Sequence, residues 1–185
     1  GYTQTTPLQL CLMTAQIANG GYKIKPKILT NDNELTSKQV KKAMEDSNLN
    51  NLNIPLFDNQ KNIKIIQEAM FSSTNELRGT SYKSRIDDPK YQFAGKTGTA
   101  QVKRISKRER ELDLKTSQIP YEERDHALYV AFGPYKNPRY ALSIIVEHGG
   151  SGSSAAAPMA TKLFKLIVDR HQYRKKLPDY KEFNI

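Results

Sequence analysis

The hydrophobic and polar residues near the start of the chain follow the period of an α-helix over residues 6–19. Thr6 is a suitable N-cap, Pro7 suits the first helical position, and Gln9 completes a capping box with Thr6. Gly20, the first of two consecutive glycines, predicts the end of the helix. The sequence therefore predicts both ends of this element.

Two weaker patterns follow the first helix. Residues 22–29 alternate as a short strand, which Pro26 restricts to a sheet edge or an irregular pairing. Residues 37–47 are compatible with a helix, within a segment rich in Asn, Asp and Lys. Both stretches are typical of surface structure, and neither indicates chemistry.

A second strong helical pattern covers residues 62–76 and ends before Gly79. The apolar face that we expect to be buried consists of Ile65 or Ile66, Ala69 and Met70. A strand is predicted to begin near Gln92 and to continue through the small residues that follow it.

Two further β patterns, residues 126–135 and 139–150, flank a short Lys-Asn-Pro turn and predict an antiparallel hairpin. A last helix is expected over residues 151–173, with Pro158 in its first turn. Its expected apolar stripe consists of Ala156, Met159, Leu163, Leu166 and Ile167. This order of elements predicts an α+β fold, with helices packed on one face of an antiparallel sheet.

The composition narrows the class of protein. The chain of 185 residues has the size of one domain, and it contains no apolar run long enough to cross a bilayer. It begins with Gly1 and shows no signal-peptide pattern, so we expect it to be a piece of a longer chain.

The formal net charge is +10. The chain has 12 basic and 9 acidic residues up to Gln92, and 17 basic and 10 acidic residues after it. No aromatic and basic recognition motif is present, so nucleic acid is not an expected partner.

A charged stretch covers residues 103–125, directly after the predicted strand near Gln92. Such a long connection is usually functional or mobile. Two interpretations remain open for its basic part, Lys103 to Arg124. It is either a solvated face, which is the usual role of charge runs, or a lid over the site that the preceding strand forms.

The chain offers few ligands for a metal ion. Cys11 is the one cysteine, and it falls on the apolar stripe of the first helix, where we expect a packed thiol rather than a nucleophile. His126, His148 and His171 are separated by 22 and 23 residues and match no local ligand motif. We therefore expect neither a metal site nor another cofactor.

The segment FAGKTGTAQ, residues 93–101, is the strongest candidate for chemistry. Its Gly-Lys-Thr resembles part of a phosphate-binding loop, but that loop requires a glycine where Lys90 stands. On a strand edge, Lys96 can attract a carboxylate and the Thr97 hydroxyl can hydrogen-bond it, while Gly98 lets a ligand backbone approach closely. The segment therefore predicts a site that docks an anion.

Four segments together resemble the C-terminal part of the transpeptidase domain of class B penicillin-binding proteins. In chain order they are GYTQTTPLQLCLMTAQIANGG, FAGKTGTAQV, DHALYVAFGPYKNPRYALSIIVEHGG and SGSSAAAPMATKLF. Lys-Thr-Gly is also one of three signature motifs shared by penicillin-binding proteins and class A β-lactamases. The KTGTAQV and EHGG pieces are most similar to the elongation-type group, penicillin-binding protein 2.

The resemblance implies a role for each residue of the motif. Lys96 and Thr97 match the residues that bind the carboxylate of a D-Ala-D-Ala stem peptide, or of a β-lactam that mimics it. Gly98 matches the glycine that admits the substrate as an extra strand. The backbone N–H of Thr99 matches one half of the oxyanion hole, and loss of such a donor typically lowers the rate about a hundredfold to a thousandfold.

The nucleophile of this family is missing from the chain. No Ser-x-x-Lys occurs, and TSYK at residues 80–83 begins with the wrong residue. STN at residues 73–75 has the form of the family's Ser-x-Asn, but that motif precedes the first of the four segments in the family, so we interpret it as a coincidence. The nucleophilic serine and its lysine are expected upstream, and the chain alone is expected to be inactive.

The resemblance implies serine acyl transfer by a peptidoglycan D,D-transpeptidase, which cross-links the cell wall during elongation and is a target of β-lactams. Residues 1–185 would then form the C-terminal portion of one transpeptidase domain. The implied location is the periplasmic face of the bacterial inner membrane, with an anchor upstream of this soluble segment. The implied partners are the stem peptide, β-lactam antibiotics, a membrane glycan polymerase and rod-shape proteins.

Two alternatives share the same strand. A serine β-lactamase or D,D-carboxypeptidase would differ from a transpeptidase in the rate at which the acyl-enzyme is hydrolysed. A penicillin-binding-like sensor module without turnover would differ in whether a Ser-x-x-Lys lies upstream of the chain.

Overall fold

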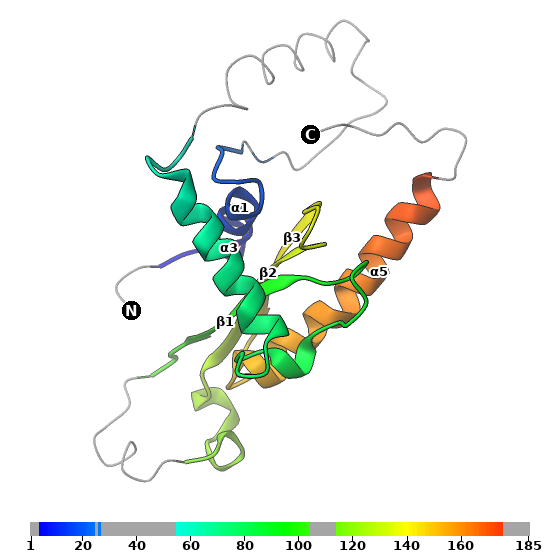
Figure 1. Cartoon of the computed structure of the whole chain (residues 1–185). Helices are drawn as coiled ribbons and strands as arrows, with labels where there is room; N and C mark the ends of the chain where they lie inside the picture. Colours follow the sequence, from blue (N-terminus) through cyan, green and yellow to red (C-terminus); the bar gives the residue numbers. More distant parts are fainter. Residues whose placement is uncertain (1–3, 25, 27–54, 104–113, 176–185) are drawn as a thin grey trace, which may run out of the picture.

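The computed structural model describes residues 4–24, 26, 55–103 and 114–175, with side chains as far as residue 170 (Figure 1). The helices are α1 (Pro7–Ala18), α3 (Gln60–Asn75) and α5 (Ala157–Lys175), and the strands are β1 (Ala94–Ala100), β2 (His126–Gly133) and β3 (Tyr140–Val146). The 3-10 turns are η1 (Tyr82–Ser84), η2 (Thr116–Gln118) and η3 (Tyr121–Glu123), and η4 (Gly152–Ala156) is a π-helical turn.

Local sequence signals set both ends of α1, as predicted. The Thr6 hydroxyl accepts a hydrogen bond from the Gln9 N–H at 3.2 Å, and the Gln9 side-chain oxygen accepts the Thr6 N–H at 2.8 Å. These bonds satisfy two donors that a helix start leaves without partners. Gly20 and Gly21 follow with φ of 93° and 89°, a conformation that favours glycine.

The three strands form one antiparallel sheet in the order β1-β2-β3. In the register, Gly98 on β1 lies opposite Leu128 on β2, and Leu128 lies opposite Ile145 on β3. The predicted hairpin and the predicted strand after Gln92 are both confirmed. The α+β class is confirmed as well.

Helices cover both faces of the sheet, so the expectation that they pack on one face is wrong. Successive residues of a strand point to opposite faces. On β2, Ala131 belongs to the hydrophobic cluster under α5, whereas Phe132 belongs to the cluster that contains Ile17 of α1 and Met70 of α3. Figure 1 shows the same arrangement, with α1 and α3 on one side of the strands and α5 on the other.

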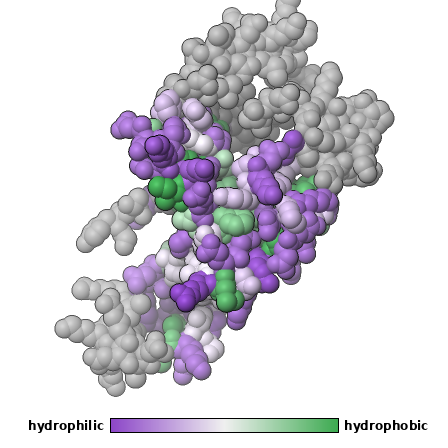
Figure 2. All heavy atoms as spheres, viewed as in Figure 1, coloured by the Kyte–Doolittle hydropathy of each residue, from purple (hydrophilic) through white to green (hydrophobic). Residues whose placement is uncertain are grey.

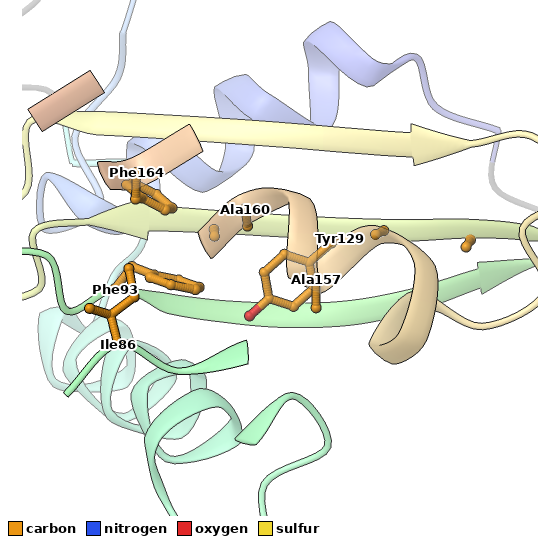
Figure 3. Close-up of a cluster of buried hydrophobic side chains, with 9 residues drawn as sticks. Ile86, Phe93, Tyr129, Ala157, Ala160 and Phe164 are labelled. Atoms are coloured by element: carbon orange, nitrogen blue, oxygen red, sulfur yellow. The ribbon is translucent and has the colours of Figure 1, made fainter. Parts of the chain in front are cut away.

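The buried face of α5 differs from the predicted stripe. Among the residues of α5 whose side chains the structure describes, Ala157, Ala160, Phe164 and Val168 are buried. Ala156 of the predicted stripe is buried too, at the end of η4. Met159, Leu163 and Leu166 belonged to the predicted stripe, and they are 46%, 39% and 67% exposed. Figure 3 shows Ala157, Ala160 and Phe164 of α5 facing the strands. Small residues at the contact let the helix lie close to the sheet, and the Phe164 ring stacks on Phe93 at 4.7 Å between centroids.

The buried face of α3 is also shifted from the prediction. Met70 is buried as expected, together with Ile63 and Thr74. Ile65 and Ile66, which we expected to be buried, are 62% and 39% exposed, and Ala69 is exposed too. The helix begins at Gln60 behind an Asn59 cap, two residues before the predicted start.

The remaining predicted elements lie partly outside the described residues. Tyr22 forms an isolated bridge with Pro55, and most of the expected strand over 22–29 and the helix over 37–47 lie outside the described part. The charged stretch contains η2 and η3, while its residues 104–113 also lie outside. Its ends are held together by an ion pair between Lys103 and Glu123, with 2.6 Å between Nζ and Oε2.

Candidate functional site

Lys96, Thr97, Gly98 and Thr99 occupy the centre of β1. Among the residues that the structure describes, β1 pairs with β2 alone, so it forms an edge of the sheet. Lys96 and Thr99 are exposed, while Thr97 and Gly98 are half-buried. An edge strand leaves a row of backbone N–H and C=O groups without partners, which an extended peptide can bind.

The ammonium group of Lys96 is available to bind an anion. Its Nζ donates a hydrogen bond to the backbone oxygen of Thr97 at 2.9 Å. Within the described ranges, no carboxylate forms an ion pair with Lys96. A ligand carboxylate that arrives at β1 would therefore not have to displace a side-chain carboxylate from the described part of the protein.

Two glycines on β1 have different surroundings. A Cβ atom on Gly95 would collide with the hydroxyl and ring of Tyr129, so the fold itself requires glycine there. A Cβ atom on Gly98 would have one neighbour within 4 Å, the Leu128 Cβ at 3.4 Å, which is ordinary contact. Internal packing therefore explains Gly95 but leaves Gly98 unexplained.

The space above Gly95 is occupied by the side chain of Tyr129, which reaches from β2 across β1 (Figure 3). Its hydroxyl lies 2.9 Å from Thr74 Oγ1 and donates to Ser81 Oγ at 3.0 Å. Burial raises the pKa of Tyr129, although its two hydrogen bonds act in the opposite direction. The cluster of Tyr129, Thr74 and Ser81 joins the sheet to the end of α3 and to η1.

The Thr97 hydroxyl contacts a second group of hydroxyls at the same end of α3. Thr97 Oγ1 is 3.4 Å from Thr80 Oγ1, and Thr80 Oγ1 is 3.1 Å from Ser73 Oγ. These contacts were not predicted from the sequence, in which TSYK at residues 80–83 was interpreted only as an incomplete Ser-x-x-Lys. The Gly-Thr-Ser at 79–81 was the one available signal, since glycine next to hydroxyl residues favours a tight turn.

The segment after β3 packs against the Lys-Thr-Gly motif. A Cβ atom on Gly152, the first residue of η4, would lie 2.7 Å from the backbone oxygen of Gly98 and 3.2 Å from its nitrogen. It would also collide with the backbone oxygen of Leu128. Gly152 therefore allows η4 to support the strand that carries the motif.

The STN segment at residues 73–75 supports the fold rather than forming a separate site. The Asn75 side-chain nitrogen donates to the backbone oxygens of Phe71 at 3.0 Å and Phe93 at 2.9 Å. These bonds join the last turn of α3 to the residue before β1. The contacts of Asn75 are thus internal.

Two of the three histidines meet at the end of the sheet near Ala100. The backbone N–H of His148 donates to His126 Nδ1 at 3.0 Å, and the two ring centroids are 4.9 Å apart. In this bond His126 Nδ1 is the acceptor. The described residues contain no group of three His, Cys, Asp or Glu side chains that could hold a metal ion.

Cys11 is a half-buried thiol on α1, where its Sγ donates to the backbone oxygen of Ala141 on β3 at 3.5 Å. Burial raises the pKa of Cys11 above the ordinary thiol value, which reduces the fraction of reactive thiolate. The environment therefore fits the expected packed thiol.

In the described part of the chain, no helix combines the length and the hydropathy needed to span a membrane.

Comparison with known proteins agrees with this arrangement. The family model for the penicillin binding protein transpeptidase domain matches residues 1–165. The chain therefore belongs to the penicillin-binding protein transpeptidase family, as the four segments of the sequence indicated.

Within this family, the chain is similar to peptidoglycan D,D-transpeptidases named MrdA. It is 30% identical over 191 residues to the protein of Haemophilus influenzae, covering 100% of this chain and 26% of that protein. It is 34% identical over 158 residues to the protein of Acinetobacter baumannii, covering 84% of this chain and 21% of that protein. The chain thus spans about a quarter of the length of these curated relatives.

Solved structures of penicillin-binding protein 2 share the fold. The Pseudomonas aeruginosa protein in complex with WCK 5153 has a TM-score of 0.61 and 31% identity, covering 89% of this chain and 30% of that chain. The Helicobacter pylori complex between penicillin-binding protein 2 and MreC has a TM-score of 0.60 and 28% identity, covering 95% of this chain and 26% of that chain. The resemblance to penicillin-binding protein 2 is thereby confirmed.

Proposed function

We propose that residues 1–185 are the C-terminal portion of the transpeptidase domain of a peptidoglycan D,D-transpeptidase, and that β1 docks the D-Ala-D-Ala end of a stem peptide. Lys96 and Thr97 bind the terminal carboxylate, and Gly98 lets the peptide backbone lie against the strand. The backbone N–H of Thr99 supplies one half of the oxyanion hole. A β-lactam that carries a carboxylate occupies the same strand.

The observation that supports this proposal is that β1, at the edge of the sheet, has an exposed lysine and an unhindered glycine. Lys96 is exposed, and no described carboxylate pairs with it. Gly98 lies three residues after the buried Gly95, and a Cβ atom at Gly98 would make only one contact, at an ordinary distance. An exposed cation, a hydroxyl and a strand edge that no described strand pairs with match the carboxylate end of a peptide.

A larger domain would complete the site. The nucleophilic serine and its lysine are proposed to lie upstream, since the chain holds no Ser-x-x-Lys. Large apolar side chains on the outer face of α5, at Met159, Leu163 and Leu166, are exposed in this chain, and a larger domain would cover such a face. This fits a chain that spans about a quarter of its curated relatives. By itself the chain is proposed to form no acyl-enzyme.

The proposed setting is that of a membrane-anchored enzyme of cell-wall elongation, and one relative supports a part of it. One similar structure contains penicillin-binding protein 2 in complex with MreC. We therefore propose a rod-shape protein of that kind as a partner of the full-length protein. A membrane glycan polymerase is a second proposed partner. The proposed location is the periplasmic face of the inner membrane, with the anchor upstream of these residues.

The test uses the full-length protein that contains this chain and a fluorescent penicillin that bears a carboxylate. Lys96→Ala should slow formation of the covalent adduct about tenfold to a hundredfold, the loss expected for a hydrogen bond to a charged group. Lys64→Ala is the matched control, because Lys64 is an exposed lysine of α3 outside the Lys-Thr-Gly motif, and it should leave the rate unchanged.

Three outcomes would contradict the proposal. A wild-type protein that forms no adduct would exclude a penicillin-binding enzyme. A wild-type rate that Lys96→Ala leaves unchanged would exclude this strand as the carboxylate site. An adduct that is hydrolysed within seconds would favour a β-lactamase over a transpeptidase.

A further inference from the structure

A row of three hydroxyl groups leads from the end of α3 to the proposed carboxylate site. Ser73 lies in the last turn of α3, Thr80 lies between α3 and η1, and Thr97 lies on β1. Their oxygens are separated by 3.1 Å from Ser73 to Thr80 and by 3.4 Å from Thr80 to Thr97. Three separate segments thus converge on the hydroxyl proposed to bind the ligand.

The backbone on both sides of Thr80 is held closely against α3. A Cβ atom on Gly79 would collide with the backbone oxygen of Ser73, so glycine permits this close approach. On the other side, Ser81 donates to that same Ser73 oxygen twice, from its backbone N–H and from its hydroxyl, both at 3.0 Å. Ser81 is itself buried and bonded to Tyr129. Thr80 is therefore placed beside Thr97 by its neighbours on either side.

Each hydroxyl in the row has a single proton to donate, which fixes the direction of the hydrogen bonds when a carboxylate is bound. A carboxylate only accepts hydrogen bonds, so Thr97 must use its single hydroxyl proton to bind the ligand. The Thr97 oxygen can then only accept a bond from Thr80, and Thr80 in turn can accept one from Ser73. A hydroxyl that accepts a hydrogen bond becomes a stronger donor, so each bond in the row strengthens the next one. Long hydrogen bonds in a ligand-free site commonly shorten when the ligand binds.

We propose that Thr80 is a positioning residue for the carboxylate site, and that it orients the Thr97 hydroxyl so that the proton points at the ligand. This inference rests on the proposed function of β1. It adds a residue outside the Lys-Thr-Gly motif, 17 positions before Thr97, and gives Ser73 a supporting role.

The test measures acylation of the full-length protein by the fluorescent penicillin. Thr80→Val removes the hydroxyl and nearly keeps the shape, and it should lower the second-order rate constant about fivefold, the effect of one neutral hydrogen bond. Thr80→Ser keeps the hydroxyl and should restore most of the rate. Ser73→Ala should have a smaller effect than Thr80→Val, because it removes only the first donor of the row.

Ser72→Ala is the matched control, because the Ser72 hydroxyl bonds to Glu76 at 2.7 Å and does not belong to the row. A second reagent separates positioning from general damage to the fold. With the same penicillin methylated at its carboxylate, Thr80→Val should change the rate less than twofold, since the ester takes no charge-assisted bond from Thr97. A general loss of structure would slow both reagents equally.

The outcomes distinguish the two proposals. The role of Thr80 is overturned if the wild type is labelled and Thr80→Val reacts as fast as the wild type. It is also overturned if Thr80→Val slows the acid and the ester equally. Either result leaves the proposed function intact. A wild type that is not labelled overturns the proposed function and this inference with it. A fivefold loss confined to the carboxylate reagent supports both.

Discussion

Gly95 and Gly98 are three residues apart on β1, yet they are glycines for different reasons. Gly95 is buried and leaves room for the side chain of Tyr129, which crosses the strand to reach Thr74 and Ser81. Gly98 has no such neighbour, and its nearest contact would be ordinary. At the scale of single residues, one glycine serves the fold and the other is proposed to serve the ligand.

This difference predicts opposite effects of two alanine substitutions in the full-length protein. Gly95→Ala should destabilise the protein by about 1–3 kcal/mol, because the added methyl group overpacks a buried site. Gly98→Ala should change the free energy of unfolding by no more than about 0.5 kcal/mol. It should nevertheless slow acylation by the fluorescent penicillin, because the methyl group holds the ligand backbone away from β1.

Chemical denaturation and adduct formation measured on both variants provide the check, and each variant is the control for the other. A stable Gly95→Ala protein would contradict the packing argument. A Gly98→Ala protein acylated at the wild-type rate would contradict the proposed approach of the ligand.

The residues of the Lys-Thr-Gly motif could be predicted from the sequence, because their proposed chemistry depends on three consecutive side chains. Thr80 could not be predicted in this way. Its contact with Thr97 joins positions 17 residues apart, and it exists only because the turn after α3 packs against Ser73. Rules based on the spacing of neighbouring residues in the sequence do not predict a contact of this kind.

At the scale of elements, the sequence predicted where helices begin better than which face they bury. The Thr6 cap of α1 depends on residues within one turn, so it could be predicted. On α5, the stripe through Leu163 and the stripe through Phe164 both have a helical period. The sheet selects the stripe with Ala160 and Phe164, since these residues fit against Phe93 and Tyr129.

The far part of α5 is joined to the segment before β1 by a surface cluster of Lys90, Tyr91 and Asp169. Asp169 Oδ1 accepts from the Tyr91 hydroxyl at 2.6 Å and from Lys90 Nζ at 2.9 Å. The hydrogen bond from Tyr91, and then that from Lys90, lowers the pKa of Asp169. The bonds from Lys90 to Tyr91 and Asp169 raise the pKa of Lys90.

The lowered pKa of Asp169 predicts how this cluster depends on pH. The folded pKa lies below that of an unfolded aspartate, which is about 3.9, so the cluster contributes stability in full above that pH. The contribution declines as the pH falls through the folded pKa. Asp169→Asn should therefore lower the melting temperature at neutral pH, and its difference from the wild type should shrink below about pH 4.

Melting curves of the full-length protein at several pH values test this prediction. Asp58→Asn is the control, because Asp58 is exposed and carries no ion pair among the described residues. A difference between Asp169→Asn and the wild type that stays constant down to pH 3 would argue against a role for the ionised carboxylate.

At the scale of the whole molecule, the described part has its helices on both faces of a three-stranded sheet and the candidate site on an edge. Its visible surface is mainly hydrophilic, with scattered hydrophobic side chains (Figure 2). The four family segments were sufficient to predict the family, and the order of helical and β patterns was sufficient to predict the α+β class. The two-sided packing was predictable from β2 itself, whose residues are apolar on both faces, because a nearly continuous apolar run is typical of a strand that is covered on both sides.

In the proposed reaction, β1 docks the carboxylate of a ligand whose acyl group is transferred to a serine elsewhere in the full-length protein. Peptide mapping by mass spectrometry, after reaction of the full-length protein with the fluorescent penicillin, identifies the residue that carries the acyl group. We predict a single acylated serine, in a Ser-x-x-Lys that lies outside residues 1–185, and about tenfold to a hundredfold slower formation of that adduct in Lys96→Ala. An adduct on a residue within this chain, such as Ser81, would contradict the proposed role of β1 as a docking strand without the nucleophile.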